Sequence, residues 1–177
     1  MAADYLISSL QPLDIDGAAP YAPARFLAMC RAQLSPVQAD ALAAALDGNP
    51  VPTDWSVAAR WRDLEVQIRN AVAAERARAR GQDPARWRRP VDGCSLFWAN
   101  RVAAAFQEKD PAKRDRLLDQ VRWDAAGELT PAASPLSAAA ALTYAIRLSI
   151  VLRRQALSAE AGNAVFDRLT AATKLEF

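Results

Sequence analysis

The sequence predicts an all-α protein of one domain, a bundle of about six to seven helices with one long helix near residues 55–80. Apolar residues recur at spacings of three and four along several segments, as on the buried face of an amphipathic helix. A serine or aspartate directly followed by proline, a pair typical of helix starts, precedes three of the expected helices, at residues 35, 110 and 134. Glycine and proline separate the segments, and no segment requires a strand. We expect residues 1–177 to form a single helical domain, since this length suffices for one substantial core.

The chain begins with an N-terminal arm and loop over residues 1–21. Residues 4–10 form an apolar run that is too short for its periodicity to separate a strand-like arm from one turn of helix. Gly17, Pro20 and Pro23 follow, and such punctuation predicts a loop over this part of the chain.

A helical hairpin is expected over residues 22–48. Its first helix covers about residues 22–34, where the apolar residues at helical spacing are Phe26, Leu27, Cys30 and Leu34. Ser35 caps the second helix, and Gln38 completes a capping box with it. That helix ends before Gly48, a residue typical of helix C-termini.

The longest expected helix covers residues 54–80, starting at Trp55. Thr53 or Asp54 is a suitable cap, and Gly81 follows the last turn. Roughly 26 residues would make a helix about 39 Å long at 1.5 Å per residue. One face is a continuous apolar stripe of Val57, Trp61, Leu64, Ile68, Ala71 and Val72.

Residues 92–174 are expected to hold the remaining helices. These are a helix over about residues 94–107, a helix that begins after the pair Asp110-Pro111, an apolar helix over residues 135–157 that begins after Ser134, and a last helix capped by Ser158 with Val165, Phe166 and Leu169 on its apolar face.

The sequence contains no histidine, which excludes Ser-His-Asp and Cys-His hydrolases, histidine-bound metals and imidazole acid–base catalysis. Its two cysteines, Cys30 and Cys94, lie far apart and cannot form a conventional zinc site without histidine. We interpret both as buried thiols that behave as small apolar residues. No Walker loop, GxGxxG or HExxH motif is present, so we expect no cofactor, no metal and no enzyme activity.

Two pairs of carboxylates, Asp63 with Glu65 and Asp115 with Asp119, have the residue types of an acid–base pair. No glycine-rich loop or nucleophile motif accompanies them. We therefore interpret all four as surface charges.

Arginine supplies 19 of the 22 basic residues, and its distribution is uneven. Residues 55–101 carry ten arginines and five acidic residues, a net charge of +5, whereas residues 1–54 have a net charge of −4. The whole chain has a net charge of only +2. The basic region supplies a candidate interaction surface, which consists of Arg60, Arg69, Arg76, Arg80, Arg86, Trp87, Arg88 and Arg89.

Three interpretations of this surface stay open. Arginine pairs well with phosphate and carboxylate, so the surface could bind nucleic acid or an acidic protein. It could also be a solvated helix face whose charges are balanced by Asp63, Glu65 and Glu75. No nucleic-acid-binding motif is present, and we expect no nucleic-acid partner.

The five tryptophans divide by their surroundings. Trp61 and Trp98 lie among apolar helical positions and are expected in the core. Trp87 lies between Arg86 and Arg88 in a polar segment, which favours a role at an interface, where tryptophan and arginine are enriched.

No apolar run approaches the roughly 20 residues needed to span a bilayer. The most apolar stretch, residues 136–152, is interrupted by Arg147, which is typical of a core helix rather than a membrane span. The N-terminus lacks a basic region followed by a long apolar one, so we expect no signal peptide. A cytoplasmic protein without direct membrane insertion is the expectation.

Four helical patterns that together cover nearly the whole chain also carry a resemblance. They are Tyr5-Leu-Ile-Ser-Ser-Leu10 with Pro12; Trp61-Arg-Asp-Leu-Glu65 with Ile68-Arg69-Asn70 and Ala74-Glu-Arg-Ala77; Pro111 with Arg114-Asp115, Leu118-Asp119 and Arg122-Trp123; and the helix at 141–148 with Gly162 and Phe166. Together they resemble the bacterial family of unknown function numbered 2764. The resemblance implies an all-helical protein that is encoded beside V-type ATPase subunits and is similar in character to the C subunit, which couples the rotor stalk to the membrane ring. It implies no site residues.

On this resemblance we expect a non-catalytic helical subunit, or an accessory or assembly factor, of a bacterial V-type (A/V-type) rotary ATPase. Its partners would be other protein subunits of the stalk or catalytic sector, and its location would be peripheral to the inner membrane through that complex. The chain is shorter than a full C subunit, so its role covers part of that function or differs from it. The alternative is a free-standing helical interaction or regulatory module, for example a homodimer that packs through the long helix.

Overall fold

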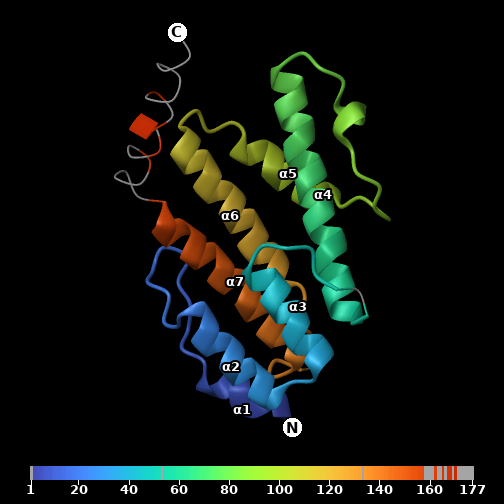
Figure 1. The fold of residues 1–177 in the computed structure, drawn as a ribbon. Helices are drawn as coiled ribbons and strands as arrows, with labels where there is room; N and C mark the ends of the chain where they lie inside the picture. Colours follow the sequence, from blue (N-terminus) through green and yellow to red (C-terminus); the bar gives the residue numbers. More distant parts are fainter. Residues whose placement is uncertain are drawn as a thin grey trace.

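The computed structural model describes residues 2–52, 54–132 and 134–157, together with positions 162, 165, 167, 168 and 170. Every regular element within these residues is helical, which confirms the all-α prediction (Figure 1). In chain order the elements are α1 (Ala2–Ser9), α2 (Pro23–Gln33), α3 (Pro36–Leu46), α4 (Ser56–Ala79), the 3-10 helix η1 (Pro84–Trp87), α5 (Leu96–Ala105), α6 (Pro111–Gly127) and α7 (Ala138–Ala156).

The N-terminal arm, for which the sequence left two alternatives, is the short helix α1, which packs on α2 and α7. The loop that follows is held by two tyrosines. The Tyr21 hydroxyl accepts a hydrogen bond from the backbone N–H of Gln11 at 3.2 Å, and the Tyr144 hydroxyl of α7 donates to the Gln11 carbonyl at 2.9 Å. These bonds tie the predicted loop to the central helix.

The predicted hairpin is formed by α2 and α3. Its capping box is present, because the Ser35 hydroxyl accepts from the Gln38 N–H at 3.4 Å and the Gln38 side chain accepts from the Ser35 N–H at 3.2 Å. Gly48 follows α3 with φ of +70°, the left-handed conformation in which glycine lacks the steric cost of a side chain.

The predicted starts of α5 and α6 are confirmed to within two residues. The Ser95 hydroxyl accepts from the Trp98 N–H at 3.5 Å at the start of α5. The Asp110 carboxylate accepts from the Ala112 N–H at 2.9 Å, and Pro111 occupies the first position of α6. Each cap satisfies an N–H that has no partner inside its helix.

One predicted cap and one predicted helix start are wrong. Asp54 does not cap α4: the N-cap position belongs to Trp55, which has extended backbone angles and no side-chain capping bond, while Thr53 lies outside the described residues. The pair at Ser134 does not start α7 either. The Ser137 N–H donates to the Ser134 carbonyl at 3.2 Å, so the chain makes a turn first, and α7 begins at Ala138. The predicted last helix and its cap Ser158 fall on a stretch that is mostly outside the described residues.

Helix α7 is the centre of the bundle. It packs against α1, α3 and α6, and in Figure 1 it runs between the α2–α3 hairpin and α6. Its buried residues lie all around the helix, as expected for a helix surrounded by others; they are Ala139, Ala141, Leu142, Thr143, Ala145, Ile146, Leu148, Ile150 and Val151.

Arg147 is accommodated within this apolar helix by the neighbouring α6. Its Nε donates to the Trp123 carbonyl at 3.2 Å, and its guanidinium lies 4.9 Å from the centre of the Trp123 ring. Burial lowers the pKa of the Arg147 guanidinium. The aromatic face and the carbonyl stabilise the charge that burial disfavours.

The expected core tryptophans, Trp61 and Trp98, are both buried. Cys30 is also buried, and burial raises the pKa of its thiol to about 12. Cys94 is exposed, which corrects the expectation that both thiols are buried. It lies in the loop before α5 rather than inside that helix, so no apolar face of a helix covers it.

Candidate functional site

A cleft of about 700 Å³ lies between α4 on one side and α6 with α7 on the other. In Figure 1 the axis of α4 is inclined to those of α6 and α7. We call this feature the arginine cleft. It is lined by residues 48–51 before α4; by Trp61, Arg62, Glu65, Val66, Arg69, Val72, Ala73, Arg76, Ala77 and Arg80 of α4 and its C-cap; by Gln82, Trp87 and Arg89; by Asp115, Leu118, Asp119 and Arg122 of α6; and by Ile146, Ser149, Ile150 and Arg153 of α7.

The α4 wall of the cleft is one continuous face of that helix. Its lining residues recur every three or four positions, and Arg62, Arg69 and Arg76 are separated by seven, or about two turns. Elsewhere α4 packs on α5 and η1, with a smaller contact to α6. The face toward the cleft is therefore the side of α4 that other elements of the described chain leave open.

The lining is strongly basic. Seven arginines and three carboxylates line the cleft, which gives a net charge of +4. Arg62 is bonded to Asp63 at 2.8 Å, and Arg69 to Glu65 at 2.7 Å. Three further lining arginines, Arg76, Arg80 and Arg89, form no ion pair with any described residue. Their charge is available to a partner.

The floor of the cleft is apolar and belongs to the core. It is made by buried side chains from three helices, namely Trp61, Val72, Ala77, Leu118, Ile146 and Ile150. A basic rim around an apolar floor combines the two surfaces that a protein partner needs: charge for orientation and apolar area for affinity.

The segment after α4 is fastened to that helix by Asn70. Its side-chain amide donates to the Arg89 carbonyl at 2.9 Å, and its side-chain oxygen accepts from the Arg89 N–H at 2.9 Å. Gln67 acts similarly one turn earlier, where it accepts from the Ser95 N–H at 2.9 Å. These bonds hold Trp87 at the cleft with 56% of its surface exposed.

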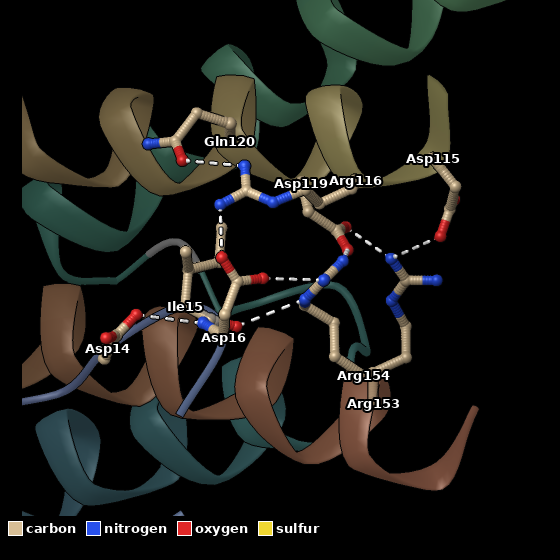
Figure 2. Close-up of polar contacts among 9 residues, drawn as sticks. All are labelled: Asp14, Ile15, Asp16, Asp115, Arg116, Asp119, Gln120, Arg153 and Arg154. Carbon is tan, nitrogen blue, oxygen red and sulfur yellow. Dashed lines mark hydrogen bonds and ion pairs between the residues drawn. The ribbon is translucent and has the colours of Figure 1, made fainter. Parts of the chain in front are cut away.

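On the α6–α7 side, Asp119 is the centre of a charge network (Figure 2). Its side chain is only 1% exposed and pairs with both Arg153 and Arg154 at the end of α7, the latter at 3.5 Å. Arg153 also reaches Asp115 at 3.3 Å. Two arginines in the last turn of α7 also lie favourably for the dipole of that helix.

The same network reaches the loop after α1. Arg154 donates to the Asp16 carboxylate at 2.8 Å and to the Ile15 carbonyl at 3.1 Å, and Arg116 of α6 pairs with Asp16 as well (Figure 2). The hydrogen bond from Arg116 lowers the pKa of Asp16. Burial disfavours the charge on Arg153, but Asp119 and Asp115 outweigh it and raise the pKa of Arg153. The network joins three distant parts of the chain beside the cleft.

Glu65 occupies the middle of the α4 wall. Its side chain is 15% exposed and pairs with Arg69, while its Oε2 lies 3.4 Å from Nε of Arg122 on α6. That oxygen is buried and accepts no hydrogen bond from the described residues, whereas Oε1 accepts from the same Nε of Arg122 at 3.4 Å and from Nε of Arg69 at 2.7 Å. Glu65 thus links the two walls of the cleft.

The lining offers binding chemistry and no evident acid–base pair. All three of its carboxylates, Glu65, Asp115 and Asp119, are already engaged by arginines. The Ser149 hydroxyl donates to the Ile146 carbonyl of its own helix at 2.7 Å. The interpretation of both carboxylate pairs as surface charges needs correction, because Asp119 is buried and Glu65 nearly so.

The structure divides the predicted interaction surface into two groups. Five of its residues line the arginine cleft, namely Arg69, Arg76, Arg80, Trp87 and Arg89. Arg60 lies on a separate shallow hollow with Asp63 and Asp92, and Arg86 and Arg88 are exposed outside the cleft. Only part of the predicted surface faces the cleft, because a helix of this length turns some of its arginines away from any one neighbour.

Sequence analysis missed the second wall of the cleft. Arg122 and Arg153 lie 53 and 84 positions after Arg69 in the chain, so no local spacing connects them with α4. A signal existed in Asp119, a carboxylate between the apolar Leu118 and Val121, where a charged residue needs a buried partner.

Two further features of the described residues bear on function. None of their helices has both the length and the apolar character that a membrane span requires. Across the same part of the chain, no three potential ligands among cysteine, aspartate and glutamate are grouped closely enough to hold a metal ion.

The fold and the cleft define a class, an all-α bundle with a basic, partly apolar cleft suited to binding another molecule. Compared with family models, curated proteins and solved structures, the chain matches none of them.

Proposed function

We propose that this protein is a non-catalytic, protein-binding subunit or assembly factor of a bacterial V-type rotary ATPase. The observation that carries the binding role is the arginine cleft, with a net charge of +4 around an apolar floor. The choice of the ATPase rests on the resemblance of the helical patterns to the family numbered 2764. The partner is another protein subunit of that complex.

The side chains of the cleft support binding rather than catalysis. The chain has no histidine, and the three lining carboxylates are bonded to arginines. An acid–base group must be free to take or release a proton at the substrate, and none of these carboxylates is free.

Affinity purification from the native organism tests the proposal. A tagged copy expressed at its natural level is expected to recover V-type ATPase subunits in stoichiometric amounts. Recovery of the tagged protein without any ATPase subunit would overturn the assignment to that complex. A tagged unrelated helical protein of similar net charge serves as the control for non-specific capture.

A second candidate is a free-standing homodimeric interaction module, favoured by a different observation. Leu96 and Phe97 at the start of α5 are 72% and 60% exposed, and such neighbouring apolar side chains often mark an interface. Light scattering after size exclusion separates the two candidates. A dimer that is lost in the Phe97→Ser variant would favour the module, and a monomer at high concentration would exclude it.

A further inference from the structure

We infer that one acidic amphipathic α-helix of a partner protein binds over the mouth of the arginine cleft, along the C-terminal half of α4. The inference deepens the proposed function and rests on it only in requiring a protein in the cleft. It does not depend on which complex supplies that protein.

The shape of the lining favours a helix. The cleft face of α4 extends from Trp61 to Arg80, about 29 Å at 1.5 Å per residue. The apolar residues on this face do not alternate as in a strand but lie on one side of the helix, and Leu118 and Ile150 belong to the opposite wall. A partner helix of about three turns could lie over the mouth of the cleft between Arg69 and Arg80, beyond the contact of Glu65 with Arg122 that joins the two walls, and could direct one or two apolar side chains into the cleft.

Charge complementarity specifies the polar side of this partner. Arg76, Arg80 and Arg89 have no ion pair in the described chain, and all three line the cleft. Carboxylates placed on the flanks of the partner helix would meet these guanidiniums with two hydrogen bonds each. Such a partner would therefore have to break no ion pair within the described chain.

The exposed ring of Trp87 marks the same end of the cleft. It lies with Arg80 and Arg89 in the lining, and tryptophan with arginine is the residue combination most enriched at energetically dominant contacts. We expect the partner to place an aliphatic side chain against this ring.

Nucleic acid fits the cleft less well, although arginine also binds phosphate. The lining includes Glu65, Asp115 and Asp119, which would repel a phosphate backbone, and the exposed part of the Trp87 side chain would stay uncovered by it. A protein helix can place an apolar side chain against Trp87 and a basic residue opposite Asp115, whose side chain is 45% exposed.

Fluorescence anisotropy with the full chain and three labelled synthetic peptides tests the inference. One peptide of about 19 residues has leucines on one face and glutamates on its flanks. The second has the same composition in an order that removes the apolar face, and the third has lysine in place of glutamate. The first is expected to bind at least about tenfold more tightly than either of the others, and to weaken as salt rises.

Two double variants with the same change in charge locate the site. Arg76→Glu with Arg80→Glu reverses two free arginines of the cleft, whereas Arg86→Glu with Arg88→Glu reverses two exposed arginines outside it. The first variant is expected to weaken the acidic peptide at least about tenfold, and the second less than about threefold. Circular dichroism melts verify that both variants are folded.

Several outcomes would overturn the inference. They are equal affinity for the ordered and reordered peptides, equal loss in the two double variants, tighter binding of a single-stranded DNA oligonucleotide, or a dimer that only the cleft variant dissociates. The proposed function is judged separately. If the wild type recovers ATPase subunits and the cleft variant recovers them equally, the complex stands and the cleft inference fails; if the peptide binds but no ATPase subunit is recovered, the reverse holds.

Discussion

Helices α7 and α4 are similar in length, yet α7 is enclosed by its neighbours and α4 leaves one face open. In α7, alanine, leucine and isoleucine lie on every side, and α1, α3 and α6 cover them. In α4, Trp61, Val72 and Ala77 are buried at the floor of the cleft, whereas the arginines beside them line it and are covered by no element of the described chain. A helix face bordered by charged arginines can remain in water, whereas α7 could not.

The largest expected difference between the enclosed and the open parts of the molecule is in the rate at which their two cysteines react. Cys30 lies buried on α2, while Cys94 is exposed before α5. Iodoacetamide is expected to label Cys94 at least about a thousandfold faster, because Cys30 reacts only after the structure opens. Mass spectrometry over time measures both rates, and labelling of Cys30 at the rate of Cys94 would show that α2 does not seal the core.

The buried thiol of Cys30 is also expected to make the stability of the fold depend on pH. Its pKa is raised to about 12 in the folded protein, whereas a thiol in the unfolded chain has a pKa near 9.0. The folded state therefore keeps a proton that the unfolded state loses, so this contribution to stability is complete below pH 9 and declines as the pH rises above it. Denaturant unfolding of the wild type and Cys30→Ala is expected to show a smaller alkaline decline in the variant.

Replacement of Trp61 tests whether the floor of the open cleft is part of the core. Trp61→Ala is expected to reduce the free energy of unfolding by about 3–5 kcal/mol, the cost of removing a buried aromatic ring. Arg78→Ala is the control on the same helix, since Arg78 is exposed, and a change within about 0.5 kcal/mol is expected. An unchanged melting temperature in Trp61→Ala would mean that the placement of α4 is wrong.

Two aspartates of α6, Asp119 and Asp115, are expected to contribute unequally to the stability of the charge network beside the cleft. Asp119→Ala is expected to cost about 2–4 kcal/mol, because it leaves Arg153 and Arg154 without their buried partner. Asp115→Ala should cost less than about 1 kcal/mol, since the pair it forms with Arg153 is about half exposed. Urea unfolding measures both, and equal effects would contradict the central role of Asp119.

The smallest expected effects come from two serines at helix starts. Ser35 makes a capping bond on α3, so Ser35→Ala should cost about 1 kcal/mol. Ser137 holds the same position on α7 but makes no capping bond, and its buried hydroxyl has no hydrogen-bond partner among the described residues. Ser137→Ala is therefore expected to be neutral or stabilising. Thermal melts that rank the two variants in the opposite order would contradict the capping assignment.

Most of the fold was predictable because its determinants are local. The capping box of Ser35 and Gln38, the cap at Asp110 and the stripe that includes Trp61 act within one or two turns of a helix. The prediction failed where a nearby residue formed a competing hydrogen bond. At Ser134 the cap and proline were present, but a turn closed by the N–H of Ser137 delayed the helix.

The sequence by itself determined that the protein is helical, where most helices begin, that Trp61 and Trp98 are buried, and that no histidine-dependent chemistry is possible. The tertiary structure alone decided that five of the eight predicted surface residues line one cleft, and that Asp119 is buried between two arginines. The physical reason is the range of the interactions. Capping and periodicity act between neighbours in the chain, whereas a cleft and a buried ion pair join residues from separate helices whose packing no short spacing records.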